Sequence, residues 1–396
     1  MSDYPKDWEE VKINNVSPIR GGYAFKSEMY VKNGVPIVRI SNILSNETIG
    51  GDFECYKSLT NDNDFKLFNG AVVIAMSGAT TGKVALLRLK KEAYYYQNQR
   101  VGYFKESDDI NNCFLFYVVR GTSFKKYLNS ILSTGAQPNI SPKQINKFSF
   151  KKPPLEEQKA IADTLMTFDK HIENLEKLIE KKKMVRDGAV EDLMTGKTRL
   201  DGFDGKWEEI ELGKICNIYD GTHQTPKYTN NGIRFVSVED ISNLKDSRKF
   251  ISINDFRKDF KIYPENKDIL MTRIGDIGTP CLLKDDEKIA YYVSLALLKN
   301  IKINSEYLYH YIRSSNFKNE LDKRILHHAT PIKINKNDIG KCQVNYPTDI
   351  KEQEAIASIL TSMDYEIENL EKEKAKIEKI KVGAMDDLLT GKVRLI

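Results

Sequence analysis

The chain of 396 residues is poor in cysteine, and its cysteines form no close pairs. The five are scattered, odd in number and never spaced as C-x-x-C, which argues against a disulfide framework or a zinc ribbon. Reduced, packed thiols are typical of a cytoplasmic protein. No apolar run approaches the roughly 20 residues of a membrane span. The start, Met1 to Trp8, is polar rather than basic and then apolar like a signal peptide. We therefore expect a cytoplasmic protein.

Catalytic signatures are also missing from the sequence. A phosphate-binding G-x-x-x-x-G-K-[ST] loop ending at Gly196-Lys197-Thr198 would need a glycine where Glu191 stands. No glycine fingerprint for a dinucleotide or a methyl donor opens a strand-to-helix turn. The five histidines show no metal-ligand spacing with cysteine or carboxylate. We predict that this chain is not an enzyme by itself and holds neither a metal nor a cofactor.

What the sequence does contain is a long internal repeat. The segment that begins Glu157-Gln158-Lys159-Ala160-Ile161-Ala162 returns as Glu352-Gln353-Glu354-Ala355-Ile356-Ala357, an offset of 195 residues. That offset holds without a gap to the C-terminus, and 23 of the 44 positions from 157 to 200 are identical. The protein is therefore a tandem duplication.

Each copy of this repeat predicts a long helix. Apolar residues recur in steps of three and four, with Glu and Lys between them, so one face can pack against a partner helix. Gly196 and Gly391 follow the last apolar residues, where a helix end favours glycine. Two helices of about 40 residues would each be roughly 60 Å long. The apolar positions are Ile161, Leu165, Phe168, Ile172, Leu175 and Ile179, then Ile356, Leu360, Met363, Ile367, Leu370 and Ile377.

The segments before the two helices are related more loosely. The only two tryptophans, Trp8 and Trp207, occupy equivalent places at an offset of 199. Short β-rich runs separated by Gly and Asn turns predict mixed α/β domains, and helical patterns follow in 112–131 and 306–326. We predict an α+β chain with domains at 1–152 and 201–345 and helices within 153–200 and 346–396. The predicted strands are 35–40, 71–75, 83–89, 100–104, 233–238, 268–273 and 295–301.

Charge and loop composition favour binding of nucleic acid over catalysis. The two domains carry net charges of +7 and +2, whereas the helical segments carry −1 and −3. Arg and Lys can address guanine, and Asn and Gln can address adenine, in the major groove. Candidate DNA-binding residues are Tyr23, Lys26, Ser77, Thr80, Lys83, Asn98, Gln99, Arg100, Gln137, Asn139 and Ser141 in the first domain. In the second they are Thr222, His223, Thr225, Lys227, Tyr228, Arg273, Asp276, His327, His328 and Thr330.

Specific motifs stand at the helix entry, Pro153 to Ala162, and at the helix exits, Asp192 to Leu200 and Asp387 to Leu395. Chiefly through these motifs, the whole chain resembles the specificity subunits of Type I restriction-modification enzymes. Ser77 to Val84 and Gly221 to Tyr228 are similar to stretches of that family's recognition domains. The second domain departs from the first at Ala329 to Ile334, near where Gln137 to Ser141 stands. Contacts in that loop therefore cannot be transferred from one domain to the other by sequence.

This resemblance implies two target recognition domains, each reading half of a split double-stranded DNA sequence. It also implies that the two helices pack as an antiparallel coiled coil, an arrangement that the residues alone leave open. The two halves would then form a pseudo-two-fold internal repeat. The implied partners are methyltransferase subunits, expected to be two, and restriction subunits. S-adenosylmethionine, ATP and magnesium are expected on those partners and not on this chain.

Other functions remain open on the sequence alone. One is a specificity subunit that serves a fused methyltransferase-nuclease. A second is a coiled-coil scaffold that does not read DNA, and a third is an autonomous nuclease or methyltransferase without recognisable motifs. Sequence-independent, salt-sensitive DNA binding would favour the scaffold.

Overall fold

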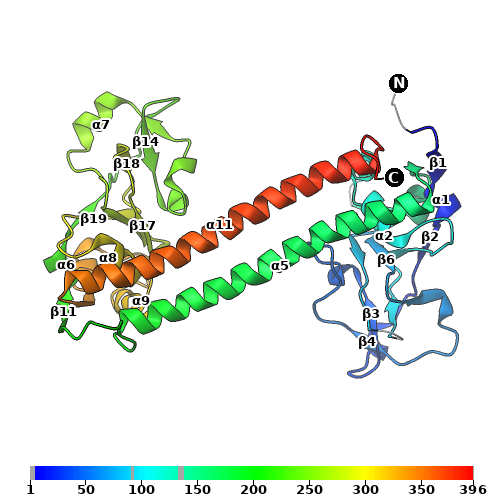
Figure 1. Ribbon diagram of the computed structural model, residues 1–396, viewed down its shortest axis with the longest axis horizontal. Helices are drawn as coiled ribbons and strands as arrows, with labels where there is room; N and C mark the ends of the chain where they lie inside the picture. Colours follow the sequence, from blue (N-terminus) through cyan, green and yellow to red (C-terminus); the bar gives the residue numbers. More distant parts are fainter. Residues whose placement is uncertain (1–4, 91–92, 133–137, 396) are drawn as a thin grey trace. The chain divides into compact units, whose positions relative to one another are not determined.

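The computed structural model describes residues 5–90, 93–132 and 138–395 of the chain, which separates into two compact units. Unit 1 comprises residues 1–175 and 373–396, and unit 2 comprises residues 176–372. Each unit contains one α/β domain and parts of two long helices, α5 (Leu155–Met194) and α11 (Ile350–Leu389) (Figure 1). Both helices have the predicted 40 residues.

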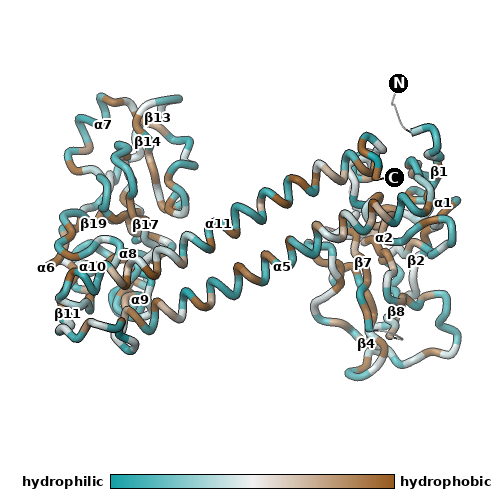
Figure 2. The backbone as a smooth tube through the Cα atoms, viewed as in Figure 1, coloured by the Kyte–Doolittle hydropathy of each residue, from teal (hydrophilic) through white to brown (hydrophobic). Residues whose placement is uncertain are grey.

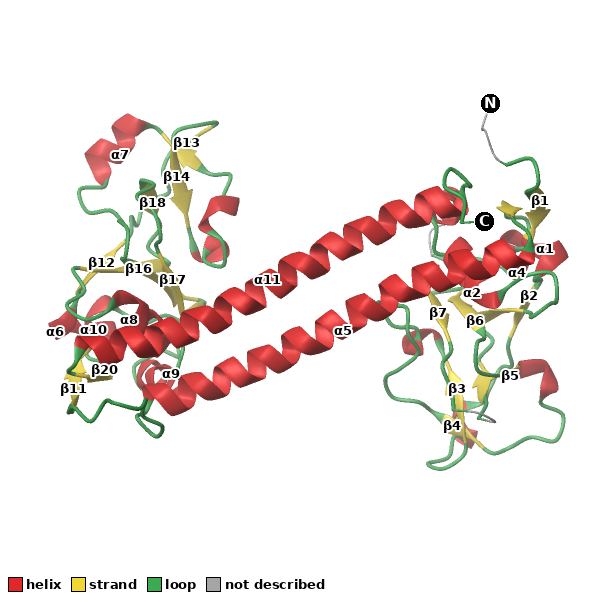
Figure 3. Cartoon of the chain, in the orientation of Figure 1, coloured by secondary structure: helices red, strands yellow, loops and turns green. Residues whose placement is uncertain are grey.

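The domain of unit 1 contains two four-stranded sheets and a two-stranded ribbon (Figure 3). One sheet, antiparallel throughout, has the order β2 (Ile19–Gly21), β9 (Val101–Phe104), β6 (Val72–Ala75), β7 (Val84–Leu86). The other has the order β4 (Cys55–Tyr56), β3 (Val35–Val38), β8 (Tyr95–Gln97), β5 (Lys66–Leu67), with β3 and β8 parallel. The ribbon pairs β1 (Glu9–Lys12) with β10 (Ser149–Lys152). The helices are α1 (Ile13–Val16), α2 (Asn112–Val118), α3 (Thr122–Leu132) and α4 (Pro142–Ile145), with short 3-10 turns at Ser27–Met29, Ile40–Asn42 and Asn63–Phe65.

The domain of unit 2 repeats the antiparallel sheet and the ribbon of unit 1 strand for strand, while its second sheet differs in one outer strand. Its antiparallel sheet has the order β12 (Asn217–Asp220), β19 (Leu295–Lys299), β16 (Ile269–Ile274), β17 (Asp276–Leu282). Its second sheet has the order β13 (Tyr228–Thr229), β15 (Phe250–Ile251), β14 (Ile233–Val236), β18 (Ile289–Tyr291), with β14 and β18 parallel. The ribbon pairs β11 (Trp207–Glu211) with β20 (Gln343–Pro347). The helices are α6 (Leu212–Ile215), α7 (Ile253–Asp259), α8 (Ser305–Ile312), α9 (Ser315–Asp322) and α10 (Lys336–Gly340), with 3-10 turns at Val238–Asp240 and Leu244–Asp246.

Every strand predicted from the sequence is confirmed to within a few residues, because each is an apolar run buried in its domain. The two predicted helical patterns each contain two helices. Arg313 and Ser314 separate α8 from α9, and the Ser314 side chain accepts a hydrogen bond from Phe317 N and caps the second helix. The sequence prediction missed the ribbon strands, which are partly exposed and carry charged residues, and it also missed β17 and β18 of unit 2.

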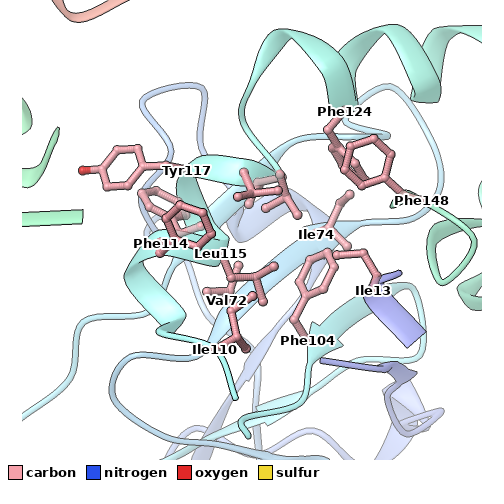
Figure 4. Close-up of a cluster of buried hydrophobic side chains, with 14 of the residues drawn as sticks. Ile13, Val72, Ile74, Phe104, Ile110, Phe114, Leu115, Tyr117, Phe124 and Phe148 are labelled. Carbon is pink, nitrogen blue, oxygen red and sulfur yellow. The ribbon is translucent and has the colours of Figure 1, made fainter. Parts of the chain in front are cut away.

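The long helices complete the core of each domain instead of standing apart from it. In unit 1, Ile161, Ala162 and Leu165 of α5 are buried in one cluster with the antiparallel sheet and α2 (Figure 4 shows the sheet and α2 side of this cluster). In unit 2, Ile356 and Leu360 of α11 join the equivalent cluster. Figure 2 shows apolar and polar residues alternating in short steps along both helices, as the sequence stripe predicted.

Within each unit the two helices run antiparallel. In unit 1, His171 of α5 lies 3.7 Å from Glu373 of α11, while Asp169 pairs with Lys381. In unit 2, Lys182 contacts Glu366 at 2.7 Å, and further along α5 Arg186 contacts Asp364 at 2.5 Å. Residues with increasing numbers along α5 therefore contact residues with decreasing numbers along α11. This is the antiparallel packing that the family resemblance implied.

The repeated Glu-Gln motif has a structural role at the start of each long helix. Glu157 is buried and accepts hydrogen bonds from Trp8 Nε1 (3.1 Å) and from Arg394 Nε (2.6 Å). We call Trp8, Glu157 and Arg394 the closing cluster of unit 1. Its counterpart in unit 2 consists of Trp207, Glu352 and Arg199, with the same atoms in contact at 3.4 and 3.1 Å.

The glutamine of this motif joins the helix to the domain. Gln158 donates to Pro153 O and accepts from Asn111 N, both at 2.8 Å. Gln353 does the same with Pro347 O and Asn304 N, also at 2.8 Å. Both glutamine side chains are buried, so these bonds satisfy polar groups that would otherwise be costly inside the domain.

A second set of ion pairs lies farther along each helix. In unit 1, Asp169 accepts from Tyr117 Oη (2.6 Å) and Arg120 (3.2 Å) and pairs with Lys381. Burial raises the pKa of Asp169, but the hydrogen bonds from Lys381 and Tyr117 and the charge of Arg120 outweigh it. The pKa of Asp169 therefore lies below its usual range.

Unit 2 has the same arrangement with different side chains. Asp364 pairs with Arg313 and with Arg186, and His310 stands where unit 1 has Tyr117. Burial raises the pKa of Asp364, but the hydrogen bond and charge of Arg313, followed by those of Arg186, outweigh it and hold the pKa below its usual range. The imidazole of His310 is buried, and its Nε2 lies 3.0 Å from Thr361 Oγ1.

Among the described residues, no helix is both long enough and apolar enough to cross a membrane. The domain boundaries drawn from the sequence at 152, 200 and 345 stay predictions. Helix α5 ends at Met194, and Gly196 follows with a φ of +69°, the left-handed conformation expected beyond a helix end.

Candidate nucleic-acid interface

The candidate loops of the first domain, far apart in sequence, meet at the ends of strands β6 and β9. Backbone hydrogen bonds join the loop after β2 to the turn after β8, that turn to the end of β6, and β6 to the segment before α4. The bonds run from Tyr23 N to Gln97 O (2.9 Å), Gln99 N to Tyr23 O (3.0 Å), Met76 N to Arg100 O (2.9 Å), Ile140 N to Met76 O (2.8 Å) and Gly78 N to Pro138 O (3.2 Å).

Four candidate side chains of this cluster are exposed. They are Tyr23, Gln99, Arg100 and Asn139, and the Tyr23 ring stacks on Phe65 with centroids 4.8 Å apart. Neither the Arg100 guanidinium nor the Asn139 amide has a hydrogen-bond or ion-pair partner among the described residues. An unpaired arginine beside an unpaired amide is available to a base edge or a phosphate.

Other first-domain candidates have partners inside the protein. Asn98 is 9% exposed, and its Oδ1 accepts from Arg100 N at 3.2 Å, so it stabilises the turn. Ser141 Oγ accepts from Gln144 N and caps α4. Lys83 Nζ donates to Ser45 Oγ at 3.0 Å.

The remaining first-domain candidates differ in surroundings. Thr80 Oγ1 lies 3.4 Å from Ile40 O, whereas the Ser77 hydroxyl is buried without a hydrogen-bond partner among the described residues. Lys26 is exposed just before the turn at Ser27–Met29. Gln137 lies outside the described residues.

The second domain gathers some of its candidates in the same way. Thr222 N donates to Tyr291 O (3.1 Å), and Gly275 N, beside the exposed candidate Asp276, donates to Ile332 O (2.9 Å). Asp276 Oδ2 accepts from Thr279 Oγ1 at 2.7 Å. Backbone bridges place Lys333 opposite both Ile274 and Leu326. This arrangement brings the loop of His327, His328 and Thr330, all exposed, to the same edge of the domain.

A second group of candidates is not joined to that cluster by any backbone hydrogen bond that the structure describes. Tyr228 lies in β13 of the other sheet, 44% exposed, with its ring 5.7 Å from that of Phe235. His223, Thr225 and Lys227 are exposed on the loop between Thr222 and β13.

Arg273 has a structural role in this structure. Its side chain is buried, with Nε donating to Ile334 O at 3.0 Å and the guanidinium paired with Asp220. A buried, paired arginine would need to break these contacts before it could reach a base. The structure therefore argues against Arg273 as a base contact, although it was predicted because arginine commonly reads guanine.

The structure adds Lys333, which was not among the predicted residues, to the candidates at this edge of the domain. This side chain is exposed on the bridge to Ile274, and it has no hydrogen-bond or ion-pair partner among the described residues. Sequence comparison placed the segment from Ala329 to Ile334 near the segment from Gln137 to Ser141, but it did not align the two residue by residue. An isoleucine followed by a helix N-cap residue could have fixed this alignment, because the pair is Ile140-Ser141 in one domain and Ile334-Asn335 in the other.

The described residues bring no group of three or more His, Cys, Asp or Glu side chains together at a metal-binding spacing. The fold and the two loop clusters define a chain with two copies of one unit, each pairing a loop-bearing α/β domain with parts of the two long helices, whose repeat is identical at 23 of 44 positions. The comparisons with known proteins identify this class. The family model described as "Type I restriction modification DNA specificity domain" matches residues 5–182 and matches again at residues 204–379. The chain belongs to this family and carries two copies of its domain.

Two relatives are named as specificity subunits of Type I restriction enzymes. The chain is 32% identical over 209 residues to the Type I restriction enzyme MjaVIII specificity subunit of Methanocaldococcus jannaschii, an alignment that covers 50% of this chain and 48% of that protein. It is 26% identical over 433 residues to the protein named "Putative type I restriction enzyme MjaX specificity subunit" of the same organism, covering 100% of this chain and 96% of that protein. The chain thus spans about half the length of the first relative and nearly all of the second.

Solved structures share the fold. The S subunit of a Type I restriction-modification system from M. genitalium superposes with a TM-score of 0.64 at 18% identity, covering 98% of this chain and 97% of that one. A chain from a study of complex assembly in a type I restriction-modification system has a TM-score of 0.61 at 17% identity, covering 99% and 100%. The predicted family and fold class are confirmed, and so is the prediction of a targeting chain rather than an enzyme.

Proposed function

We propose that this chain is the DNA-targeting subunit of a Type I restriction-modification complex in which each domain reads one half of a split target. The observation that carries the proposal is the repetition of one loop cluster in two domains with different exposed side chains. Two similar scaffolds that present different chemistry fit two different half-sites.

The long helices would set the distance between the half-sites. A helix of 40 residues is about 60 Å long, whereas one turn of DNA is about 34–36 Å. Domains joined to such helices could read half-sites about one turn apart, leaving unread base pairs between them. The antiparallel packing in each unit supports this role, because ion pairs hold the helices in register.

The helices would also dock the methyltransferase subunits. Val185 of α5 and Ile380 of α11 occupy equivalent positions of the repeat and are 52% and 44% exposed. Because one lies in unit 2 and the other in unit 1, they support two equivalent docking faces and hence two methyltransferase subunits. Restriction subunits would join the complex. S-adenosylmethionine, ATP and magnesium would bind to these partners, in the cytoplasm where the DNA is.

Exchange of one domain tests the division of labour. Replacing residues 1–152 by the first domain of a related subunit should change one half-site of the methylated sequence and leave the other unchanged. The measurement is a map of methylated adenines in cells that carry the intact system. A change in both half-sites, or in neither, would refute the proposal.

Lengthening the helices tests the spacer. Four residues inserted into α5 at the unit boundary, with four at the facing position of α11, should lengthen the unread spacer and leave both half-sites unchanged. A retained spacer would contradict the role of the helices as a ruler. Finding a fused methyltransferase-nuclease gene next to this one would instead assign the chain to that related system.

A further inference from the structure

The two loop clusters are built on one backbone pattern, and this pattern pairs residues that sequence comparison does not. In the first domain, Asn98 N donates to Val38 O (3.1 Å) and Val101 N donates to Asn98 O (3.0 Å). Together with the five bonds given above for this domain, they define what we call the loop frame. The loop frame of the second domain has seven equivalent backbone hydrogen bonds. In the order used for the first domain, they run from Thr222 N to Tyr291 O (3.1 Å), Val293 N to Thr222 O (2.9 Å), Arg273 N to Ser294 O (2.9 Å), Ile334 N to Arg273 O (3.0 Å), Gly275 N to Ile332 O (2.9 Å), Tyr292 N to Val236 O (2.9 Å) and Leu295 N to Tyr292 O (2.9 Å).

Glycines at matching places enforce the two frames. Gly78 and Gly275 both have a φ of +80°, which L side chains rarely adopt. A Cβ on Gly22 would lie 2.2 Å from Gln97 O, and one on Gly221 would lie 2.5 Å from Tyr291 O. Both frames therefore need glycine at two matching positions. The sequence itself thus supports the equivalence of the two frames.

The frames fix an equivalence between Asn139 and Lys333. Asn139 bridges Ser77, and Lys333 bridges Ile274, the residue that corresponds to Ser77. Each precedes the isoleucine that donates to the end of β6 or β16, and each lies two residues before the cap of the following short helix, α4 or α10. Position and backbone agree, while the side chains differ in chemistry.

Neither side chain is used by the fold. Both are exposed, and neither has a hydrogen-bond or ion-pair partner in the described part of the chain. Neighbouring frame positions differ in this respect. Arg273 and Ser294 of the second frame are buried and bonded within the domain, whereas Arg100, the counterpart of Ser294, is exposed. The position of Asn139 and Lys333 is thus free in both domains.

We infer that Asn139 and Lys333 are the equivalent base-reading residues of the two domains, Asn139 for an adenine and Lys333 for a guanine. The inference rests on the proposed function and adds the residue and base class to it. An asparagine amide can donate to N7 and accept from N6 of adenine, whereas a lysine ammonium can donate to O6 and N7 of guanine. An exchange of the two side chains should therefore exchange the base preference at one position in each half-site.

The test uses the full chain assembled with its methyltransferase subunits and a library of DNA with randomised half-sites. Bound DNA is recovered and sequenced for the wild type, Asn139→Lys, Lys333→Asn and the control Lys258→Asn. The control makes the same charge change on α7, outside the loop frame, at an exposed residue. Asn139→Lys should shift one position of one half-site from adenine to guanine by about fivefold or more, and Lys333→Asn should make the reverse shift in the other half-site.

The outcomes separate the inference from the proposed function. If the wild type selects a split sequence but both exchange variants select it unchanged, the inference is wrong and the proposed function stands. If the wild type selects no sequence, the proposed function fails, and the inference fails with it. Loss of selection at both half-sites in either variant would also overturn the inference, because a base-reading residue should affect its own half-site alone.

Discussion

The closing clusters of the two units and their loop frames have diverged to different degrees. In the closing clusters the same three residue types make the same contacts: Glu157 with Trp8 and Arg394, and Glu352 with Trp207 and Arg199. In the loop frames the backbone bonds match, but Arg100 faces solvent where its counterpart Ser294 is buried.

This difference separates residues that build the unit from residues that give each unit its own chemistry. A buried carboxylate held by an arginine and a tryptophan tolerates few substitutions, because removal of one partner leaves the others unpaired. An exposed side chain on a shared backbone frame can change without cost to folding. The clusters around Asp169 and Asp364 lie between these extremes, since Tyr117 is replaced by His310 while the arginine and the aspartate remain.

The largest expected effect comes from breaking a closing cluster. Glu352→Ala should destabilise unit 2 by about 4 kcal/mol, because Arg199 and the Trp207 indole lose a fully buried acceptor. Glu157→Ala should destabilise unit 1 by a similar amount. Hydrogen exchange at α8 and α2 reports the two units separately.

Glu354→Ala provides the control for that comparison, because Glu354 is exposed on the same turn of α11. It should leave exchange at α8 nearly unchanged. If the control and Glu352→Ala had equal effects, the closing cluster would have no special role.

A smaller effect should distinguish the units by pH. Burial, and next the charge of Arg313, lowers the pKa of His310 to about 4, against about 6.5 in the unfolded chain. Unfolding of unit 2 therefore takes up a proton between these values, so its stability is highest above pH 6.5 and falls as the pH drops towards 4. The loss should total about 3 kcal/mol. The groups near the imidazole are Thr361, Asp364, Arg313, Arg186 and Lys284.

Unit 1 has Tyr117 at this place, and burial raises the pKa of that phenol, so it does not titrate in this range. Exchange at α8, corrected for intrinsic rates, should increase between pH 7 and pH 5 more than exchange at α2. His310→Tyr should remove the excess. Equal acid sensitivity of α2 and α8 in the wild type would show that His310 does not control it.

The smallest expected effect sharpens the comparison of the tryptophans. Trp8 Nε1 lies 3.1 Å from Glu157, and Trp8 is 5% exposed, whereas Trp207 Nε1 lies 3.4 Å from Glu352 and Trp207 is half-buried. Trp8→Phe should therefore cost about 1.5 kcal/mol and Trp207→Phe about 0.5 kcal/mol. Urea unfolding measures both. A larger cost for Trp207→Phe would reverse the order of the two clusters.

Local patterns predicted the two long helices, the helical segments that contain α2, α3, α8 and α9, and most of the buried strands. An apolar period of three and four residues or a short apolar run is visible in a single stretch of chain. The loop frames could not be predicted in this way. They join Tyr23 to Asn98 and Met76 to Ile140, pairs more than 60 residues apart, and no local signal fixes such pairing. Arg273 was predicted as a base contact because its ion-pair partner Asp220, which lies 53 residues away in the sequence, could not be recognised from local sequence.

The contact between Arg394 and Glu157 also has a consequence for folding during synthesis. Residues 176–372, which make up unit 2, leave the ribosome before the final segment of unit 1, residues 373–395, has been made. Unit 2 can therefore complete its own core first. The domain of unit 1 is synthesised earlier but can complete its core only after residues 373–395 have been made. A protein truncated after residue 372 would keep the domain of unit 2 intact but would lose the closing cluster of unit 1.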